Sequence, residues 1–169
     1  MLNALRRRAG QRRTSQMLLD AVSARARLPV FYEAFGVADT IDGRFDLLAL
    51  HAALTLDRLS AQKLDGLAQA FVDGLFVHFD EALRQQGAGD IGMGRRMTKM
   101  ADAFYGRLKA YGEAPDDGAL AAALLRNVYR GDDSKLEPAR ALAIYVSKAR
   151  AHLAAADLAG GAVDFGPAP

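Results

Sequence analysis

The sequence predicts an all-α fold, a single irregular helical domain of about seven helices. Its 169 residues are the length of one ordinary domain, and 51% of them are apolar and 25% charged, which is typical of a soluble globular protein. Apolar residues recur every three to four positions, whereas the alternation typical of strands is nearly absent. Glycine, proline and aspartate stand between the periodic stretches, where helices are expected to end and begin.

The first two helices are predicted near the N-terminus. Pro29 suits the first turn of a short helix that Gly36 is expected to end in the left-handed conformation. Residues 38–44, ADTIDGR, have the composition of a turn. Before them, over about residues 14–27, apolar side chains recur at helical spacing: Leu18, Leu19, Val22 and Ala26.

Two long helices are predicted to form the centre of the domain. Residues 45–59 carry leucines on more than one face, which implies burial on several sides. Ser60 is the expected N-cap of the longest helix, over residues 61–86. One side of that helix carries small residues four apart, which predicts the close approach of another helix: Gly66, Ala70 and Gly74.

Three further helices are predicted over residues 91–111, about 116–129 and about 138–156. Residues suited to an N-cap, a left-handed cap or a first helical turn stand at their boundaries. These boundary residues are Asp90, Asp116 or Asp117, Gly131 and Pro138.

The chain divides into three predicted parts. Residues 1–27 form a basic N-terminal helical segment, residues 28–157 the helical domain, and residues 158–169 a flexible tail. The tail is expected to be mobile because its last ten residues, GGAVDFGPAP, contain three glycines and two prolines.

Charge is concentrated at the N-terminus. Residues 1–27 hold seven arginines and one aspartate, a net charge of +6, so the other 142 residues carry −4. Such a segment suits an anionic membrane surface or RNA, or it is a solvated, partly frayed terminus. The candidate contacts with a membrane surface or polyanion are Arg6, Arg7, Arg8, Arg12 and Arg13.

No targeting or membrane-spanning segment is predicted. The apolar stretch after Arg13 is interrupted by Asp20, and no window approaches the roughly 20 apolar residues that span a bilayer. The sequence has no cysteine, which fits a reducing compartment. We therefore expect a cytoplasmic protein, with peripheral contact at the inner face of the membrane left open.

The sequence offers little catalytic chemistry. His51, His78 and His152 each lie inside a predicted helix, so core or partner-facing positions are favoured over metal ligands. Gly92 and Gly94 lack the preceding strand and third glycine of a dinucleotide loop, and no serine has a glycine-flanked elbow. No enzyme, cofactor or metal is predicted, with a haem carrier using His51 or His78 as a rival hypothesis.

One predicted helix combines methionines with cations. Met93, Met97 and Met100 recur at helical intervals over residues 91–111. Flexible methionines either fill gaps in a core or line surfaces that accept apolar partners of varying shape. If a crevice exists, we expect it beside these methionines, with the following cations at its rim: Arg95, Arg96 and Lys99.

The order of several segments resembles the ubiquinol-cytochrome c chaperone family over about residues 28–150. They are LPVFYEAFGVADTIDGRFDLLALHAALTLDRL, FVDGLFVHFDEALRQQGAGDIGMGRRMTKMADAFYGRLKAY, LAAALLRNVYRG and ALAIYV. The resemblance implies an assembly factor that receives newly made cytochrome b, an integral membrane client, and does no catalysis of its own. The alternative is a nucleic-acid or ribosome binding module that acts through the arginine-rich N-terminus. Specific nucleic-acid binding is not expected, and the oligomeric state is left open.

The resemblance also carries over particular residues. The recurrent positions of the family are Phe31, Tyr32, Leu50, His51, Arg58, Asp73, Phe76, Lys99, Phe104, Tyr105, Gly106, Arg126 and Asn127. The apolar ones are expected in the core, and the polar ones form either a partner-facing surface or a buried polar brace. With the methionine-bearing helix, the predicted partner-binding residues are Met93, Arg95, Arg96, Met97, Lys99, Met100, Phe104, Tyr105, His51, Arg58, Arg126 and Asn127.

Overall fold

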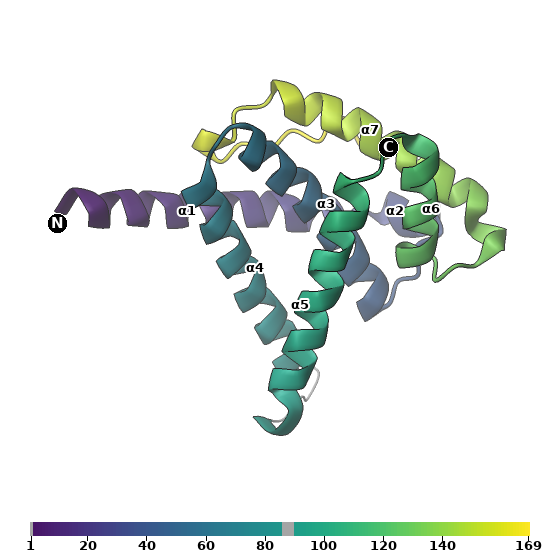
Figure 1. Cartoon of the computed structure of the whole chain (residues 1–169), viewed down its shortest axis with the longest axis horizontal. Helices are drawn as coiled ribbons and strands as arrows, with labels where there is room; N and C mark the ends of the chain where they lie inside the picture. The colour runs from purple at the N-terminus through teal and green to yellow at the C-terminus, as the bar shows by residue number, and fades with distance from the viewer. Residues whose placement is uncertain (1, 86–89) are drawn as a thin grey trace.

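The structure, a computed structural model, describes residues 2–85 and 90–169, without the side chains of 2–5, 7, 90 and 91. The described residues form seven α-helices and two short 3₁₀ turns, with no strand among them (Figure 1). The predicted all-α class and the count of about seven helices are therefore confirmed. The elements are α1 (Leu2–Ala26), α2 (Pro29–Glu33), α3 (Ile41–Ala61), α4 (Asp65–Gln85), α5 (Asp90–Gly112), α6 (Asp117–Val128), η1 (Asp133–Lys135), α7 (Leu136–Ala155) and η2 (Leu158–Gly160).

Helix α3 is the centre of the core. It packs against α1, α4, α5, α6 and α7, so its apolar residues are buried on several sides, as the leucines over 45–59 predict. Its N-terminus differs from the sequence prediction, because Thr40 accepts a hydrogen bond from the amide of Gly43 and starts the helix inside the expected turn. Asp42 and Gly43 therefore belong to the first helical turn.

The boundary between α3 and α4 also differs from the prediction. Ser60 is not the N-cap of α4, because α3 continues through Ala61 and α4 begins at Asp65. The chain reverses at Lys63, whose φ of 57° is left-handed. The amides of Lys63 and Leu64 bond to the carbonyls of Ser60 and Leu59, which is the Schellman pattern of a helix C-terminus.

Helix α4 crosses α1 at its small residues, as the spacing of Gly66 and Gly74 predicts. A Cβ added at Gly74 would lie 2.5 Å from Cδ1 of Leu19, and one at Gly66 would lie 2.5 Å from Nε2 of Gln11. The absence of side chains at these positions lets α1 lie directly on α4. Beyond this crossing α4 runs away from the core, and α5 returns to it (Figure 1).

The basic N-terminal segment is helical from Leu2 onward, earlier than the predicted start near residue 14. Its second half contributes Leu18 and Val22 to the core, whereas its first half projects from the domain (Figure 1). The side chains of Arg6, Arg8, Arg12 and Arg13 are exposed, and that of Arg7 lies outside the described residues.

The C-terminal segment, for which the sequence predicts a mobile tail, packs onto the domain. Leu158 is fully buried and Phe165 is 6% exposed. The glycines serve compact packing here, since Gly161 has a φ of 82° and lies against Met17. The burial of these two apolar side chains thus holds the segment on the domain, although its composition is that of a turn.

Other predicted boundaries agree with the structure. Pro29 begins α2, Asp116 caps α6 through the amide of Ala119, and Gly36 and Gly131 have left-handed φ values of 63° and 75°. Helix α5 begins at Asp90, but the predicted cap lies outside the described side chains. Within the described residues, no helix has the length and hydropathy needed to cross a membrane.

Candidate functional site

A groove lies between α4 and the packed ends of α1, α2 and α3, with a volume of about 380 Å³. Its walls come from the last turns of α1, from α2, from the first two turns of α3 and from the second half of α4. The groove is lined by Ser23, Ala26, Arg27, Tyr32, Ile41, Arg44, Phe45, Leu48, His78, Phe79, Glu81, Ala82, Gln85 and Met100.

The groove has apolar walls and a polar margin. Phe45 and Phe79 contact each other with ring centroids 5.3 Å apart, and Leu48 packs against the core beside them. Ile41 also lines the groove and is 56% exposed, which is unusual for a large apolar side chain. The margin includes Arg44, whose Nε lies 2.7 Å from Oδ1 of Asp39 and lowers the pKa of that carboxyl.

The groove meets the predicted methionine face of α5 at Met100 alone among its three methionines. Met93 is buried at 8% exposed, and Met97 is half-buried against the core. The expected rim cations, Arg95, Arg96 and Lys99, are exposed on α5 but do not line the groove. This groove therefore lies toward α1 and α3, and a partner surface along the methionines of α5 stays a prediction.

Two neighbouring aromatic residues of α5 differ in their exposure to solvent. Phe104 is fully buried, whereas its neighbour Tyr105 is 51% exposed. The Tyr105 ring stacks on Phe76 of α4, with centroids 6.0 Å apart and an interplanar angle of 27°. This pair provides an exposed aromatic contact between α4 and α5 outside the groove.

His51 is a buried brace rather than a surface residue. Its Nδ1 donates to the carbonyl of Leu47 at 2.7 Å, which leaves Nε2 to accept from the Tyr145 hydroxyl at 2.8 Å. Nε of Arg25 in turn donates to the same hydroxyl at 2.9 Å. Complete burial lowers the pKa of His51 to about 4, so the ring is neutral at physiological pH and ties α3 to α7 and α1.

The other polar positions implied by the resemblance separate into two groups. Arg58 donates from Nε and Nη2 to the carbonyl of Ala156, at 3.0 and 2.8 Å, and so fixes the end of α7. Asn127 is half-buried, and its carbonyl accepts from Arg130. Arg126 and Asp73 are exposed, and Asp73 accepts from Gln69 at 2.8 Å.

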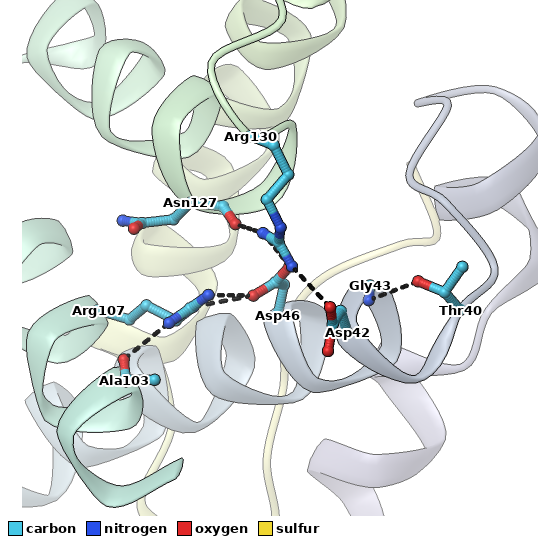
Figure 2. A network of polar contacts seen from close by, with 8 residues as sticks. All are labelled: Thr40, Asp42, Gly43, Asp46, Ala103, Arg107, Asn127 and Arg130. Carbon is cyan, nitrogen blue, oxygen red and sulfur yellow. Dashed lines mark hydrogen bonds and ion pairs between the residues drawn. The ribbon is translucent and has the colours of Figure 1, made fainter. Parts of the chain in front are cut away.

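A buried ion cluster, not predicted from the sequence, stands behind the groove. The carboxylate of Asp46 is 0% exposed and lies between Arg107 of α5 and Arg130 after α6 (Figure 2). Nε and Nη2 of Arg107 are 2.9 and 2.6 Å from Oδ1 of Asp46, and Nη1 of Arg130 is 2.8 Å from Oδ2. Burial raises the pKa of Asp46, and both guanidinium groups oppose that rise.

This cluster also fixes one wall of the groove. The guanidinium of Arg107 lies over the ring of Phe45, with Cζ 5.1 Å from the ring centroid. Phe45 lines the groove, so the ion cluster joins the groove wall to α5 and the end of α6. The sequence signal was Asp46 within a leucine-rich helix, a charged residue that needs a partner if its position is buried.

The groove combines an apolar interior with polar sides. The only titratable groups among its lining residues are Arg27, Tyr32, Arg44, His78 and Glu81 at its sides. Within the described residues no group of three or more histidine, aspartate or glutamate side chains could hold a metal ion.

Comparison with known proteins gives both a family match and a structural match. The family described as Ubiquinol-cytochrome C chaperone matches residues 33–161 of this chain. The crystal structure of the Cbp3 homolog from Brucella abortus is similar, with 37% sequence identity and a TM-score of 0.86 over 99% of this chain and 98% of that chain. Curated proteins gave no match. The groove walls from α3, α4 and α5 all lie inside the range that matches the family.

Proposed function

Because this chain belongs to the ubiquinol-cytochrome c chaperone family, we propose that it binds newly made cytochrome b during the assembly of ubiquinol-cytochrome c reductase, without catalysis of its own. The family match and the similarity to the Cbp3 homolog support the chaperone role in assembly of this reductase. The client is proposed from the family, and its place of binding from the groove.

The observation that carries the proposal is an apolar groove with an exposed isoleucine, half-buried aromatic side chains and a charged margin. Cytochrome b is an integral membrane protein, so segments awaiting insertion carry apolar side chains that must be kept from water. Ile41, Phe45 and Leu48 offer such side chains an apolar surface, and Arg27 and Arg44 beside them keep the groove hydrated at its edge.

The size of the groove limits what it holds. Its volume of about 380 Å³ is at the small end of the roughly 300–1,000 Å³ of ligand pockets. It therefore accommodates several side chains along one stripe of a helix rather than the whole helix. Such recognition by an apolar stripe is the helix-in-groove mode, which tolerates a range of sequences.

The test is photo-crosslinking in cells that are making cytochrome b, with the photoreactive residue at the groove position Gln85. The full chain is compared with Ile41→Asp, which places a charge in the groove at the first turn of α3, where an aspartate favours the helix. Ile144→Asp on α7 is the matched control, since Ile144 is 50% exposed and does not line the groove.

We expect the full chain and Ile144→Asp to recover cytochrome b, and Ile41→Asp to recover about tenfold less, since a buried charge in an apolar contact costs more than 1.4 kcal/mol. Equal recovery of cytochrome b by Ile41→Asp and Ile144→Asp would rule out the groove as the binding surface. Failure of the full chain to recover cytochrome b would rule out cytochrome b as the client. Charge reversal at Arg95, Arg96 and Lys99 tests in the same assay whether the exposed cations of α5 contribute.

The exposed arginines of α1 extend the proposal to an anionic membrane surface near the client. Arg6, Arg8, Arg12 and Arg13 project with the free half of the helix, and each contributes on the order of 1 kcal/mol beside anionic lipid. Helix α1 contains no aromatic residue on which an unpaired base could stack, which favours lipid headgroups over single-stranded RNA.

Vesicle sedimentation tests this surface, with phosphatidylcholine alone or mixed with phosphatidylglycerol. We expect binding to the anionic vesicles only, weakened by salt and lost when these four arginines are changed to glutamate. The triple reversal on α5 is the control for net charge. Retention by RNA with no retention by anionic vesicles would instead support the nucleic-acid or ribosome alternative.

A further inference from the structure

The C-terminal segment is held by a small set of side chains. The Phe165 ring stands perpendicular to that of His51, with centroids 5.2 Å apart, and is 6% exposed. The guanidinium of Arg25 lies 6.0 Å from the centroid of the same ring and 5.3 Å from that of Tyr145. An aromatic side chain is thus enclosed by α1, α3 and α7.

Arg25 also holds the backbone beside this ring. Its Nη1 donates to the carbonyl of Gly166 at 3.0 Å, and its Nη2 donates to that of Pro167 at 2.6 Å. With Nε on the Tyr145 hydroxyl, one rigid guanidinium uses three donor groups to join the segment to the buried His51 chain. No lysine offers this fork of donors.

The segment itself is shaped like a bound peptide. Residues 162–169 form no helix or strand, and two of their backbone carbonyls accept hydrogen bonds from Arg25. Gly166 has a φ of 78° and its amide donates to Asp164 at 2.7 Å, which gives the short turn its form. Buried aromatic anchors and arginines are also the residues enriched among the hot spots of protein interfaces.

The same helical turn serves the groove. Ser23, Ala26 and Arg27 line the groove, and Arg25 lies between them on α1 with its side chain directed to the C-terminal segment. A segment attached to Arg25 therefore restrains the turn that forms one groove wall. The same turn is also held by the burial of Ala26, by the hydrogen bond from the Tyr32 hydroxyl to the Ala26 carbonyl and by that from Arg25 to Tyr145, so the segment adds to these restraints.

We propose that Arg25, His51 and Tyr145 form a cradle for an extended peptide of the type Phe-Gly-Pro, occupied in cis by residues 161–167, and that this occupancy holds the groove wall of α1 in place. The consequence at the groove rests on the proposed function, whereas the cradle does not. Other peptides that place an aromatic residue before two backbone carbonyls able to accept from Arg25 belong to the same ligand class.

Hydrogen exchange of the full chain tests this proposal without any client. Phe165→Ala is expected to raise the exchange rate of the amides of residues 23–27 by about tenfold or more, as local opening becomes easier. A free peptide of residues 161–169, added to this variant, is expected to restore the slow rate. The same peptide with alanine in place of the phenylalanine is expected to have no effect.

Two further variants keep the test decisive. Arg25→Lys retains the charge but not the fork of donors, so we expect fast exchange that the peptide does not restore. Phe76→Ala removes an aromatic ring outside the cradle and is expected to leave residues 23–27 slow. Unchanged exchange in Phe165→Ala, equal acceleration in Phe76→Ala, or no rescue by the peptide would overturn the proposal. Each of these failures would leave the crosslinking test of the proposed function untouched.

Discussion

Replacement of Arg107 by methionine tests how the buried carboxylate of Asp46 is stabilised. Arg107 makes two contacts, of 2.9 and 2.6 Å, with Oδ1 of a side chain that is 0% exposed. After its removal, Asp46 retains only Arg130, whose side chain is half-exposed. Breaking a buried ion pair on one side costs about 3–5 kcal/mol, so we expect a loss of that size in the free energy of unfolding near neutral pH.

The loss should depend on pH. Burial raises the pKa of Asp46, and attraction to Arg107 opposes the rise, so its removal raises that pKa further. A carboxyl whose pKa is higher in the folded than in the unfolded state binds more protons when folded, over the window between the two values. The free energy of unfolding therefore rises as pH falls from the raised pKa toward the unfolded value of 3.8.

Urea denaturation followed by circular dichroism measures both effects, at about pH 7.5 and about pH 4.5. The difference between Arg107→Met and the unaltered chain is expected to be larger at the higher pH, and comparison at equal pH cancels the other titrating groups. Arg140→Met is the control, since this exposed arginine pairs only with exposed Glu137 and should cost less than about 0.5 kcal/mol. A loss for Arg107→Met below about 1 kcal/mol, or the same loss at both pH values, would refute the reasoning.

Three other predictions concern His51, Gly43 and Gly106. Burial lowers the pKa of His51 from 6.5 in the unfolded chain to about 4 in the folded protein. The unfolded chain therefore binds more protons between these values, and the free energy of unfolding should fall by about 3 kcal/mol as the pH drops from 6.5 to 4. In urea titrations, His51→Gln should lack this part of the loss. Gly43→Ala should destabilise by about 1–3 kcal/mol, because its Cβ would collide with the carbonyl of Ala38. Gly106→Ala should stabilise by up to about 1 kcal/mol, because nothing lies within 4 Å of the added Cβ in the middle of α5. A pH profile unchanged in His51→Gln, or glycine variants that shift stability in the same direction, would contradict these expectations.

Local signals in the sequence predicted most helices and several of their ends. Pro29, Asp116 and Gly131 act through their own backbone or the next few residues, so their effects could be recognised without knowledge of the fold. The helix break at Lys63 was missed because its left-handed φ is adopted by a lysine and not by the glycine that usually marks such a position. The leucine pattern also continues across it. Helix ends closed by backbone hydrogen bonds alone are the least visible in a sequence.

The groove could be predicted only in part. Met100 lies in it as expected of the methionine-bearing helix, but its main walls come from α1, α3 and α4. Which helices enclose a hollow depends on their crossing angles, and here the contact of Gly74 with Leu19 brings α1 against α4. The positions of Ile41 and Phe45 beside that crossing have no counterpart in local sequence pattern.

The sequence by itself determined the all-α class, the approximate helix positions and the concentration of arginines in α1, because periodicity, capping and charge are local properties. Only the tertiary structure decided that His51 pairs with Tyr145 of α7, that Asp46 is shared by two arginines, and that Phe165 fills a cradle built around Arg25. These contacts join residues 61 to 141 positions apart. Their energies come from burial and charge pairing across helices, which exist only once the helices have packed.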